Sequence, residues 1–212
     1  MNQDFDLLAP MAVLPAWTYL NTLGPLDGPL VPAGDKLIGV AGPNVFAIDI
    51  HTGKAAETAA GRPWFVELTG RKGRDPNVTS SQGVVYLMDD DSLRAVGLGD
   101  AQPLASWPKK NPQVPRCNLL LVQDGRLVAV STDNRGATLI RGFDPLTGEL
   151  KFGPYKRDDK SAGRLAYGAK AVFFVASGEF IALNTDFGDK RWGFKPKGDV
   201  LDGSSACRRS PC

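Results

Sequence analysis

The segment Gly142–Phe152, GFDPLTGELKF, contains the end of an apolar strand and an Asp-x-x-Thr-Gly turn, followed by a short charged stretch and an aromatic residue. Two other segments repeat this turn: Asp49–Gly53 is DIHTG, and Asn184–Gly188 is NTDFG. In all three, a glycine stands four residues after the Asp or Asn. A weaker copy, LRAVGLGDAQ, occupies Leu93–Gln102. The segment is therefore one copy of a repeat and not an isolated hairpin.

An aromatic residue follows each copy of the turn, and an earlier tryptophan, Trp17, fits the same spacing. The aromatics that follow the turns are Trp64, Trp107, Phe152 and Trp192. Successive aromatics are separated by 40 to 47 residues, a period typical of propellers and other repeat arrays. We predict that each one anchors the outermost strand of a repeat and covers the seam between neighbouring repeats.

Each interval also contains two apolar runs separated by a short turn, such as KLIGVA and VFAIDI around GPN. A shorter extended segment precedes the two runs, and the aromatic segment supplies a fourth strand. Four short antiparallel strands per unit are the content of a propeller blade. The sequence thus predicts one all-β propeller domain, or part of one, over 1–212, with about four blades of four antiparallel strands. The repeats span roughly 18–64, 65–107, 108–152 and 153–194, and 195–212 begins a further repeat or forms a tail.

The repeated turn has a simple physical cause. An Asp or Asn side chain can accept hydrogen bonds from backbone amides two residues on, and a glycine adopts the positive φ that ends the turn. The turn residues are therefore expected to be structural and not catalytic. They are Asp49, Thr52, Gly53, Asp144, Thr147, Gly148, Asn184 and Gly188, together with the four aromatics that follow the turns.

The segments AIDIHTGKAAE, GFDPLTGELKF and ALNTDFGDKRWGF resemble the repeats of the pyrroloquinoline-quinone-like (PQQ-like) β-propeller superfamily. The consensus of that family is Ala-x-Asp-x-x-Thr-Gly-x-x-x-Trp, and the resemblance covers nearly the whole chain. It implies a β-propeller fold. The family includes quinoprotein dehydrogenases and also non-enzymatic scaffold proteins such as outer-membrane assembly lipoproteins. The fold therefore does not give the function by itself.

The chain departs from the family in two respects. It has fewer repeats than the propellers of this family usually have, and its second copy lacks both the Asp and the Thr-Gly of the turn. An incomplete ring leaves two open edges that invite pairing with another sheet. We expect the ring to be closed by homodimerisation or by remaining propeller blades on another segment.

Composition limits the function classes. The net charge is +2, and hydrophobic residues make up 42% of the chain, which is typical of a globular domain with no strong attraction for nucleic acids or membranes. The N-terminal apolar run, Leu7–Leu14, is too short for a membrane span, contains Pro10 and follows no basic region. We expect a cytoplasmic protein, or a periplasmic or exported one if a leader has been removed.

Charge placement suggests a binding face. The loops that join the outer strand of one blade to the inner strand of the next are rich in Lys and Arg, whereas the middle hairpins on the same face carry acids. The hypothesis is a face that binds a protein or an anionic ligand; ordinary solvated loops are the alternative. Aromatics do not interleave these loops, so nucleic-acid binding is not favoured. The candidate partner-binding residues are Arg71, Lys72, Arg74, Lys109, Lys110, Arg116, Lys156 and Arg157.

No set of residues in the sequence points to catalysis or to a metal site. His51 is the only histidine and lies inside a repeat turn, and Asp89–Asp91 are adjacent residues whose side chains point in different directions. Cys117 is expected to pack as a small apolar residue, and Cys207 and Cys212 have no further ligands beside them. The sequence favours a non-catalytic interaction or scaffold module without a cofactor. The alternatives are a fragment of a PQQ-dependent dehydrogenase-like enzyme, which would use PQQ and calcium, or an accessory domain of a larger enzyme.

Overall fold

The computed structural model describes residues 17–70, 77–123, 125–157, 166–176 and 178–196. Within them the chain forms four antiparallel sheets. The first sheet contains β1 (Val31–Ala33), β2 (Lys36–Ala41), β3 (Asn44–Asp49) and β4 (Phe65–Glu67). The second contains β5 (Val78–Ser81), β6 (Val84–Asp89) and β7 (Ser92–Gly97). The third contains β8 (Cys117–Gln123), β9 (Arg126–Thr132), β10 (Thr138–Phe143) and β11 (Leu150–Arg157). The fourth contains β12 (Ala166–Gly168), β13 (Ala171–Ala176), β14 (Glu179–Asn184) and β15 (Lys190–Phe194).

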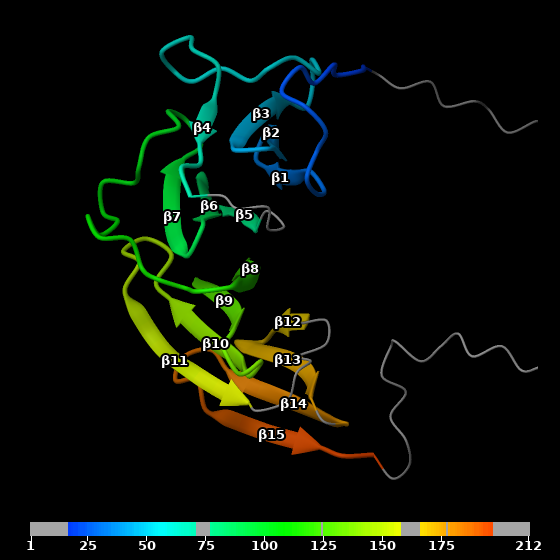
Figure 1. Cartoon of the computed structure of the whole chain (residues 1–212), viewed down its shortest axis with the longest axis vertical. Helices are drawn as coiled ribbons and strands as arrows, with labels where there is room; N and C mark the ends of the chain where they lie inside the picture. Colours follow the sequence, from blue (N-terminus) through cyan, green and yellow to red (C-terminus); the bar gives the residue numbers. More distant parts are fainter. Residues whose placement is uncertain (1–16, 71–76, 124, 158–165, 177, 197–212) are drawn as a thin grey trace, which may run out of the picture.

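The sheets follow one another along an arc, in the manner of consecutive propeller blades (Figure 1). In every sheet, each strand pairs with the strand that follows it in the chain. The first strands, β1, β5, β8 and β12, lie on the concave side of the arc, and the last strands lie on the convex side (Figure 1). The first and fourth sheets stand at the two ends of the arc. The predicted all-β fold with successive antiparallel blades is therefore confirmed, and the arc is open over the described residues.

The second sheet corrects the prediction of four strands in every blade, because it has three. Residues 101–116 occupy the place of its fourth strand, and they make only isolated bridges, at Pro103 to Val96 and at Gln113 to Ser92. Proline has no N–H to donate to a strand ladder, and this segment contains four prolines. Trp107 consequently lies in a loop. The four prolines in this segment are Pro103, Pro108, Pro112 and Pro115.

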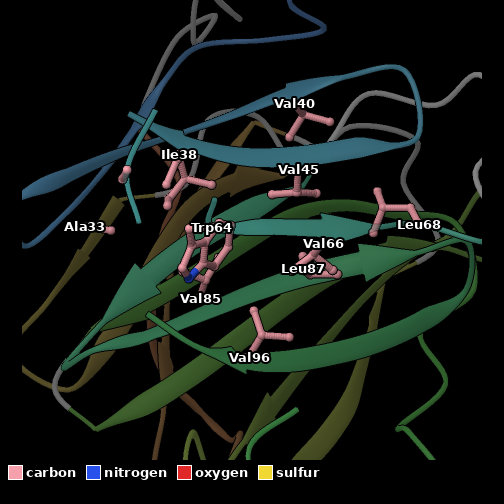
Figure 2. Close-up of a cluster of buried hydrophobic side chains, with 12 residues drawn as sticks. Ala33, Ile38, Val40, Val45, Trp64, Val66, Leu68, Val85, Leu87 and Val96 are labelled. Atoms are coloured by element: carbon pink, nitrogen blue, oxygen red, sulfur yellow. The ribbon is translucent and has the colours of Figure 1, made fainter. Parts of the chain in front are cut away.

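Apolar side chains fill the space between consecutive sheets. Between the first two sheets, Ile38 and Val45 meet Val85, Leu87 and Val96 in one buried cluster (Figure 2). Similar clusters join the second sheet to the third and the third to the fourth. Both faces of an internal sheet are buried in this way, which explains why the central strands are continuous apolar runs without polar alternation. Truncating such a buried aliphatic side chain to alanine costs about 2–5 kcal/mol.

Three of the repeated aromatics lie at these seams, as predicted. Trp64 packs in the cluster between the first and second sheets, and its indole Nε1–H donates to the Gly97 carbonyl of the second sheet at 3.1 Å. Trp107 lies in the cluster between the second and third sheets, and Phe152 lies in the cluster between the third and fourth. Each aromatic thus joins its own repeat to the next one.

The turn geometry is also as predicted. One carboxylate oxygen of Asp49 accepts hydrogen bonds from the amides of His51 and Thr52, at 3.0 and 2.8 Å, and from the Thr52 hydroxyl at 2.9 Å. Asp144 accepts from the amides of the residues two and three positions on, at 2.9 and 3.0 Å. In the fourth sheet Asn184 accepts from the amide two positions on, at 3.0 Å. These bonds satisfy amides that would otherwise lack partners at a chain reversal.

The turn glycines have a second role that the sequence did not reveal. Gly148 has φ +66°, and a Cβ there would lie 3.0 Å from the Trp107 ring. Gly188 has φ +74°, and its Cβ would lie 2.6 Å from the Phe152 ring. The aromatic of one repeat therefore stacks on the glycine of the next turn. In the weak second copy Ala101 takes the position, with φ +59°.

Trp17 covers the turn of the first sheet. Its ring lies against Gly53, and its indole Nε1–H donates to the Ile50 carbonyl at 2.8 Å. Close by, Tyr19 stacks on Phe46 with ring centroids 5.8 Å apart. Trp17 therefore covers Gly53 as Trp107 covers Gly148 and as Phe152 covers Gly188.

Candidate functional site

The structure places some of the eight candidate basic residues and leaves others outside its description. Arg71, Lys72 and Arg74 lie outside the described residues, as does the side chain of Arg157. The candidates with described side chains are exposed, and they are Lys109, Lys110, Arg116 and Lys156.

Arg116 and Lys156 meet at Asp133, in the hairpin between β9 and β10. The Arg116 guanidinium donates to the Asp133 carbonyl at 3.2 Å, and the Lys156 ammonium lies 3.2 Å from the Asp133 carboxylate. The Arg116 amide donates to the Asp91 carboxylate at 3.0 Å. The backbone hydrogen bond from Ala137 lowers the pKa of Asp133. Burial acts in the opposite direction, whereas the neighbouring Lys156 ammonium lowers the pKa further. These two basic residues therefore hold the hairpin between β9 and β10 in place.

A pocket of about 550 Å³ lies at the outer edge of the second sheet. Three segments form its wall: the connection that follows β4, the hairpin between β6 and β7, and the loop that replaces the fourth strand. The β6–β7 hairpin and the loop that follows it contribute the charged residues of the wall, namely Asp89, Asp90, Arg94 and Lys109. Lys109 is thus a candidate partner-binding residue that lines a cavity.

Asp89 is buried in the wall of this pocket and is fully engaged. It accepts hydrogen bonds from the Gly70 amide at 2.8 Å, the Thr69 hydroxyl at 3.1 Å and Arg94 Nη1 at 2.9 Å. Burial acts to raise the pKa of Asp89, but the bonds from Gly70, Arg94 and Thr69 outweigh it, so that the pKa lies below its ordinary value. Asp89 is therefore an ionised anchor that fixes Arg94 at the pocket.

The fourth sheet has an apolar surface on the side away from the third sheet. Strand register aligns Phe173, Ala182 and Trp192 across β13, β14 and β15, and pairs Phe180 with Phe194. Phe173 and Trp192 are in ring contact, with centroids 6.1 Å apart. Residues of alternate register, such as Val172, Phe174 and Ile181, pack against the third sheet. We call the surface formed by Phe173, Phe180, Trp192 and Phe194 the open face.

Exposure distinguishes the open face from the closed seams. Trp64, Trp107 and Phe152 are 1%, 8% and 5% exposed, whereas Trp192 is 50% exposed. Phe194 is also more than half exposed. The repeat thus ends with an aromatic in the same sequence position as its predecessors but without a sheet over it in the described residues.

The described residues contain no group of three or more His, Cys, Asp and Glu side chains that could hold a metal ion. His51 is exposed in its turn. Cys117 is buried, as predicted, and burial raises the pKa of its thiol to about 12, so it is protonated at neutral pH. Cys207 and Cys212 lie outside the described residues. Over the same parts of the chain, the structure has no helix that could span a membrane.

No protein-family model matches the sequence, and no curated protein matches it either. Solved structures match its fold. The computationally designed Ika8 protein superposes with a TM-score of 0.55 at 15% sequence identity, over 77% of this chain and 47% of Ika8. The computationally designed Ika4 protein has a TM-score of 0.52 at 17% identity, over 76% of this chain and 90% of Ika4.

A natural enzyme has a similar fold. The quinohemoprotein alcohol dehydrogenase ADHIIG from Pseudomonas putida HK5 superposes with a TM-score of 0.52 at 14% identity. The match covers 78% of this chain and 34% of the dehydrogenase. The chain therefore spans less than half the length of Ika8 and of the dehydrogenase. Together with its four sheets of three or four strands, these matches show an all-β fold consistent with a partial propeller.

Sequence reasoning missed both the pocket and the open face. The prolines of 101–116 were a signal for the pocket, because a segment so rich in proline cannot complete a strand ladder. Trp192 gave no such signal, since a buried and an exposed aromatic occupy the same position in the repeat.

Proposed function

We propose that this chain is a non-catalytic β-propeller interaction module that binds protein through the open face of its fourth sheet. We propose further that its partner there is a second copy of the same chain. The proposal rests on the contrast between Trp192 and its three buried counterparts, Trp64, Trp107 and Phe152. An exposed, contiguous apolar surface on a soluble domain commonly marks an interaction site.

The closed seams support a sheet as the structure that covers the open face. At the seam between the third and fourth sheets, Val128, Val130 and Ile140 of one sheet pack against Phe174 and Ile181 of the other. The aligned side chains of the open face are likewise apolar. A second sheet is the shape that covers such a surface without leaving polar groups of its own unpaired.

A second copy supplies such a sheet. In a two-fold dimer the same patch of both subunits forms the interface, so an apolar patch meets an apolar patch. The aromatic side chains Phe180, Trp192 and Phe194 would each lose exposed surface, and every Å² of apolar surface removed from water stabilises the complex by roughly 25 cal/mol. Few charges would need to be desolvated, since the aligned side chains of this face are apolar.

Sedimentation velocity over a range of protein concentrations tests the proposal. The wild-type chain is expected to dimerise, and the double variant Trp192→Ser/Phe194→Ser is expected to remain monomeric. Phe187→Ser is the matched control, because Phe187 is a more exposed aromatic of the same sheet but lies in the turn and outside the open face. This control is expected to dimerise as the wild type does. A monomeric wild type, or a double variant that still dimerises, would overturn the proposal.

The main rival is a fragment of a quinone-dependent dehydrogenase, and it is favoured by the PQQ-like repeats of the sequence and by the fold shared with the alcohol dehydrogenase. Titration with calcium and PQQ, followed by quinone absorbance, separates the two functions. We expect no saturable change for the interaction module. Saturable binding would support the dehydrogenase-like alternative.

A further inference from the structure

The missing fourth strand leaves part of the second sheet uncovered. The outward-facing backbone groups of β7 belong to Leu93, Ala95 and Gly97, because Ser92, Arg94 and Val96 face β6 in the hairpin ladder. The replacing loop satisfies most of these groups. The Leu93 amide donates to the Pro112 carbonyl at 2.9 Å, and the Gly97 amide donates to the Gln102 carbonyl at 2.8 Å.

The amide of Ala95 differs from its neighbours. Its carbonyl accepts from the Leu104 amide at 3.0 Å, but its N–H has no acceptor among the described residues. In the first sheet the equivalent amide, that of Ala47, donates to the Trp64 carbonyl at 3.3 Å. Ala95 is 1% exposed and forms part of the pocket wall. A buried N–H without a partner destabilises the fold because it has lost its hydrogen bond to water. An acceptor placed in the pocket would therefore be favoured.

Two cations line the same pocket. Arg94 uses only Nη1 in its described hydrogen bonds, to Asp89 and to the Glu67 carbonyl. Its Nε and Nη2 have no acceptor in the part of the chain that the structure describes. Lys109 is exposed and has no acceptor for its ammonium among the described residues. The pocket thus presents backbone, guanidinium and ammonium donors that its own acceptors do not satisfy.

We propose that this pocket binds a carboxylate. One carboxylate oxygen accepts from the Ala95 amide, and the other faces Arg94 and Lys109. Charge-assisted hydrogen bonds of this kind are roughly twice as strong as neutral ones. The site is independent of the open face, because it lies at the outer edge of the second sheet and shares no residue with the fourth.

The acids of the pocket limit the charge of the ligand. Asp89 is neutralised by Arg94 and by its two further donors, whereas Asp90 is exposed at the rim. A doubly charged phosphate would face both of these carboxylates, while a carboxylate adds a single negative charge. A neutral amide would satisfy the Ala95 N–H but would leave Lys109 without a counter-charge. The charges of the wall therefore favour a monocarboxylate.

Titration of the ¹⁵N-labelled full chain by NMR tests the proposal, with the Ala95 amide as the reporter. N-acetylglycine is the probe, and N-acetylglycinamide is its control because it differs only in lacking the carboxylate. We expect a saturable downfield shift of the Ala95 proton with the acid, at concentrations up to about 50 mM, and a much smaller response to the amide. Inorganic phosphate is expected to bind more weakly than the acid.

Two exposed neighbours give a matched pair of variants. Lys109→Gln is expected to weaken the binding of N-acetylglycine about tenfold, as the loss of a charge-assisted bond predicts. Lys110→Gln is expected to have no effect, because Lys110 does not line the pocket. Neither residue is buried, so both variants should fold.

A longer peptide acid distinguishes the source of the carboxylate. If acetyl-tetraglycine binds more tightly than N-acetylglycine, the site takes a peptide C-terminus; equal affinity indicates a small free carboxylate, and both results support the proposal. Three results would overturn it: no saturable shift at Ala95, equal responses to acid and amide, or equal losses in the two lysine variants. Phosphate binding as tight as that of the acid would also overturn the assignment to a carboxylate.

Discussion

The seam between the third and fourth sheets and the open face of the fourth sheet contain the same kind of residue in different surroundings. Phe152 and Trp192 follow equivalent turns and lie in equivalent outer strands, β11 and β15. Phe152 is buried by the next sheet, whereas Trp192 is half exposed. The aromatic at this position of the repeat is therefore buried by the sheet that follows it, and its own strand alone does not bury it.

Truncation of Phe152 and of Trp192 should show the largest difference in stability between the closed seam and the open face. Phe152→Ala is expected to lower the free energy of unfolding by about 3–5 kcal/mol, because it leaves a cavity in a closed seam. Trp192→Ala should cost less than about 1 kcal/mol when measured at concentrations too low for association. Urea denaturation followed by circular dichroism measures both. Equal losses in the free energy of unfolding would contradict the idea that the following sheet is what makes the aromatic stabilising.

The glycine under Phe152 gives the next largest effect. A Cβ at Gly188 would meet the Phe152 ring at 2.6 Å, whereas one at Gly178 would meet nothing within 4 Å. Both glycines have positive φ, so both alanine variants carry backbone strain of about 1 kcal/mol. We expect Gly188→Ala to cost about 1–3 kcal/mol more than Gly178→Ala, because the ring must move. Thermal unfolding of the pair measures the difference, and equal melting temperatures would contradict the stacking.

An ion pair across the same seam has a smaller effect. Arg126 Nη2 lies 3.1 Å from the Asp186 carboxylate, and Arg126 Nε donates to the Thr185 carbonyl at 3.3 Å. Arg126→Gln is expected to cost about 1 kcal/mol at low salt and less at high salt. Lys151→Gln is the control, since Lys151 pairs with Glu149 within one sheet. An Arg126 effect that does not change with salt would argue against the ion pair.

Low pH should destabilise the Asp turns of the first and third sheets and leave the Asn turn of the fourth sheet unchanged. The backbone hydrogen bond from Thr52 lowers the pKa of Asp49. Burial acts to raise the pKa of Asp144, but hydrogen bonds from the amides of Thr147 and Leu146 outweigh it, so that this pKa is also lowered. A lowered pKa stabilises the fold above the unfolded value of about 4, and this stabilisation is lost as the pH falls through the folded value. Asn184 does not titrate. Amide exchange at pH about 5 and about 2.5 should therefore show opening of the first and third turns before the fourth.

Sequence alone was sufficient for the repeat and for its turns, because both depend on local chemistry. An Asp or Asn followed four residues later by glycine specifies the same chain reversal wherever it occurs, and continuous apolar runs specify strands with two buried faces. The absence of a fourth strand from the second sheet, over the described residues, is explained by the prolines of 101–116, which cannot donate to a strand ladder. The stacking of Phe152 on Gly188 could not be found, since it joins residues of different repeats.

The candidate sites were less accessible to sequence reasoning. Basic composition pointed to the connecting loops, and Lys109 does line the pocket. Arg116 and Lys156 instead contact Asp133 in the hairpin between β9 and β10, and composition cannot distinguish such structural contacts from partner binding. Ala95 carries no chemical signal in the sequence. Its N–H has no acceptor among the described residues because β7 has no fourth strand paired beside it.

Trp17 places a limit on how far copies of this chain could assemble. A module with two equivalent sticky ends would grow head to tail into a filament of indefinite length. Here the turn glycine at one end of the arc, Gly53, is already covered by the chain's own tryptophan. Addition of another copy at that end would first have to displace Trp17 and break its hydrogen bond to Ile50. If two copies pair through their open faces as proposed, Trp17 therefore disfavours further growth from the other end of the arc.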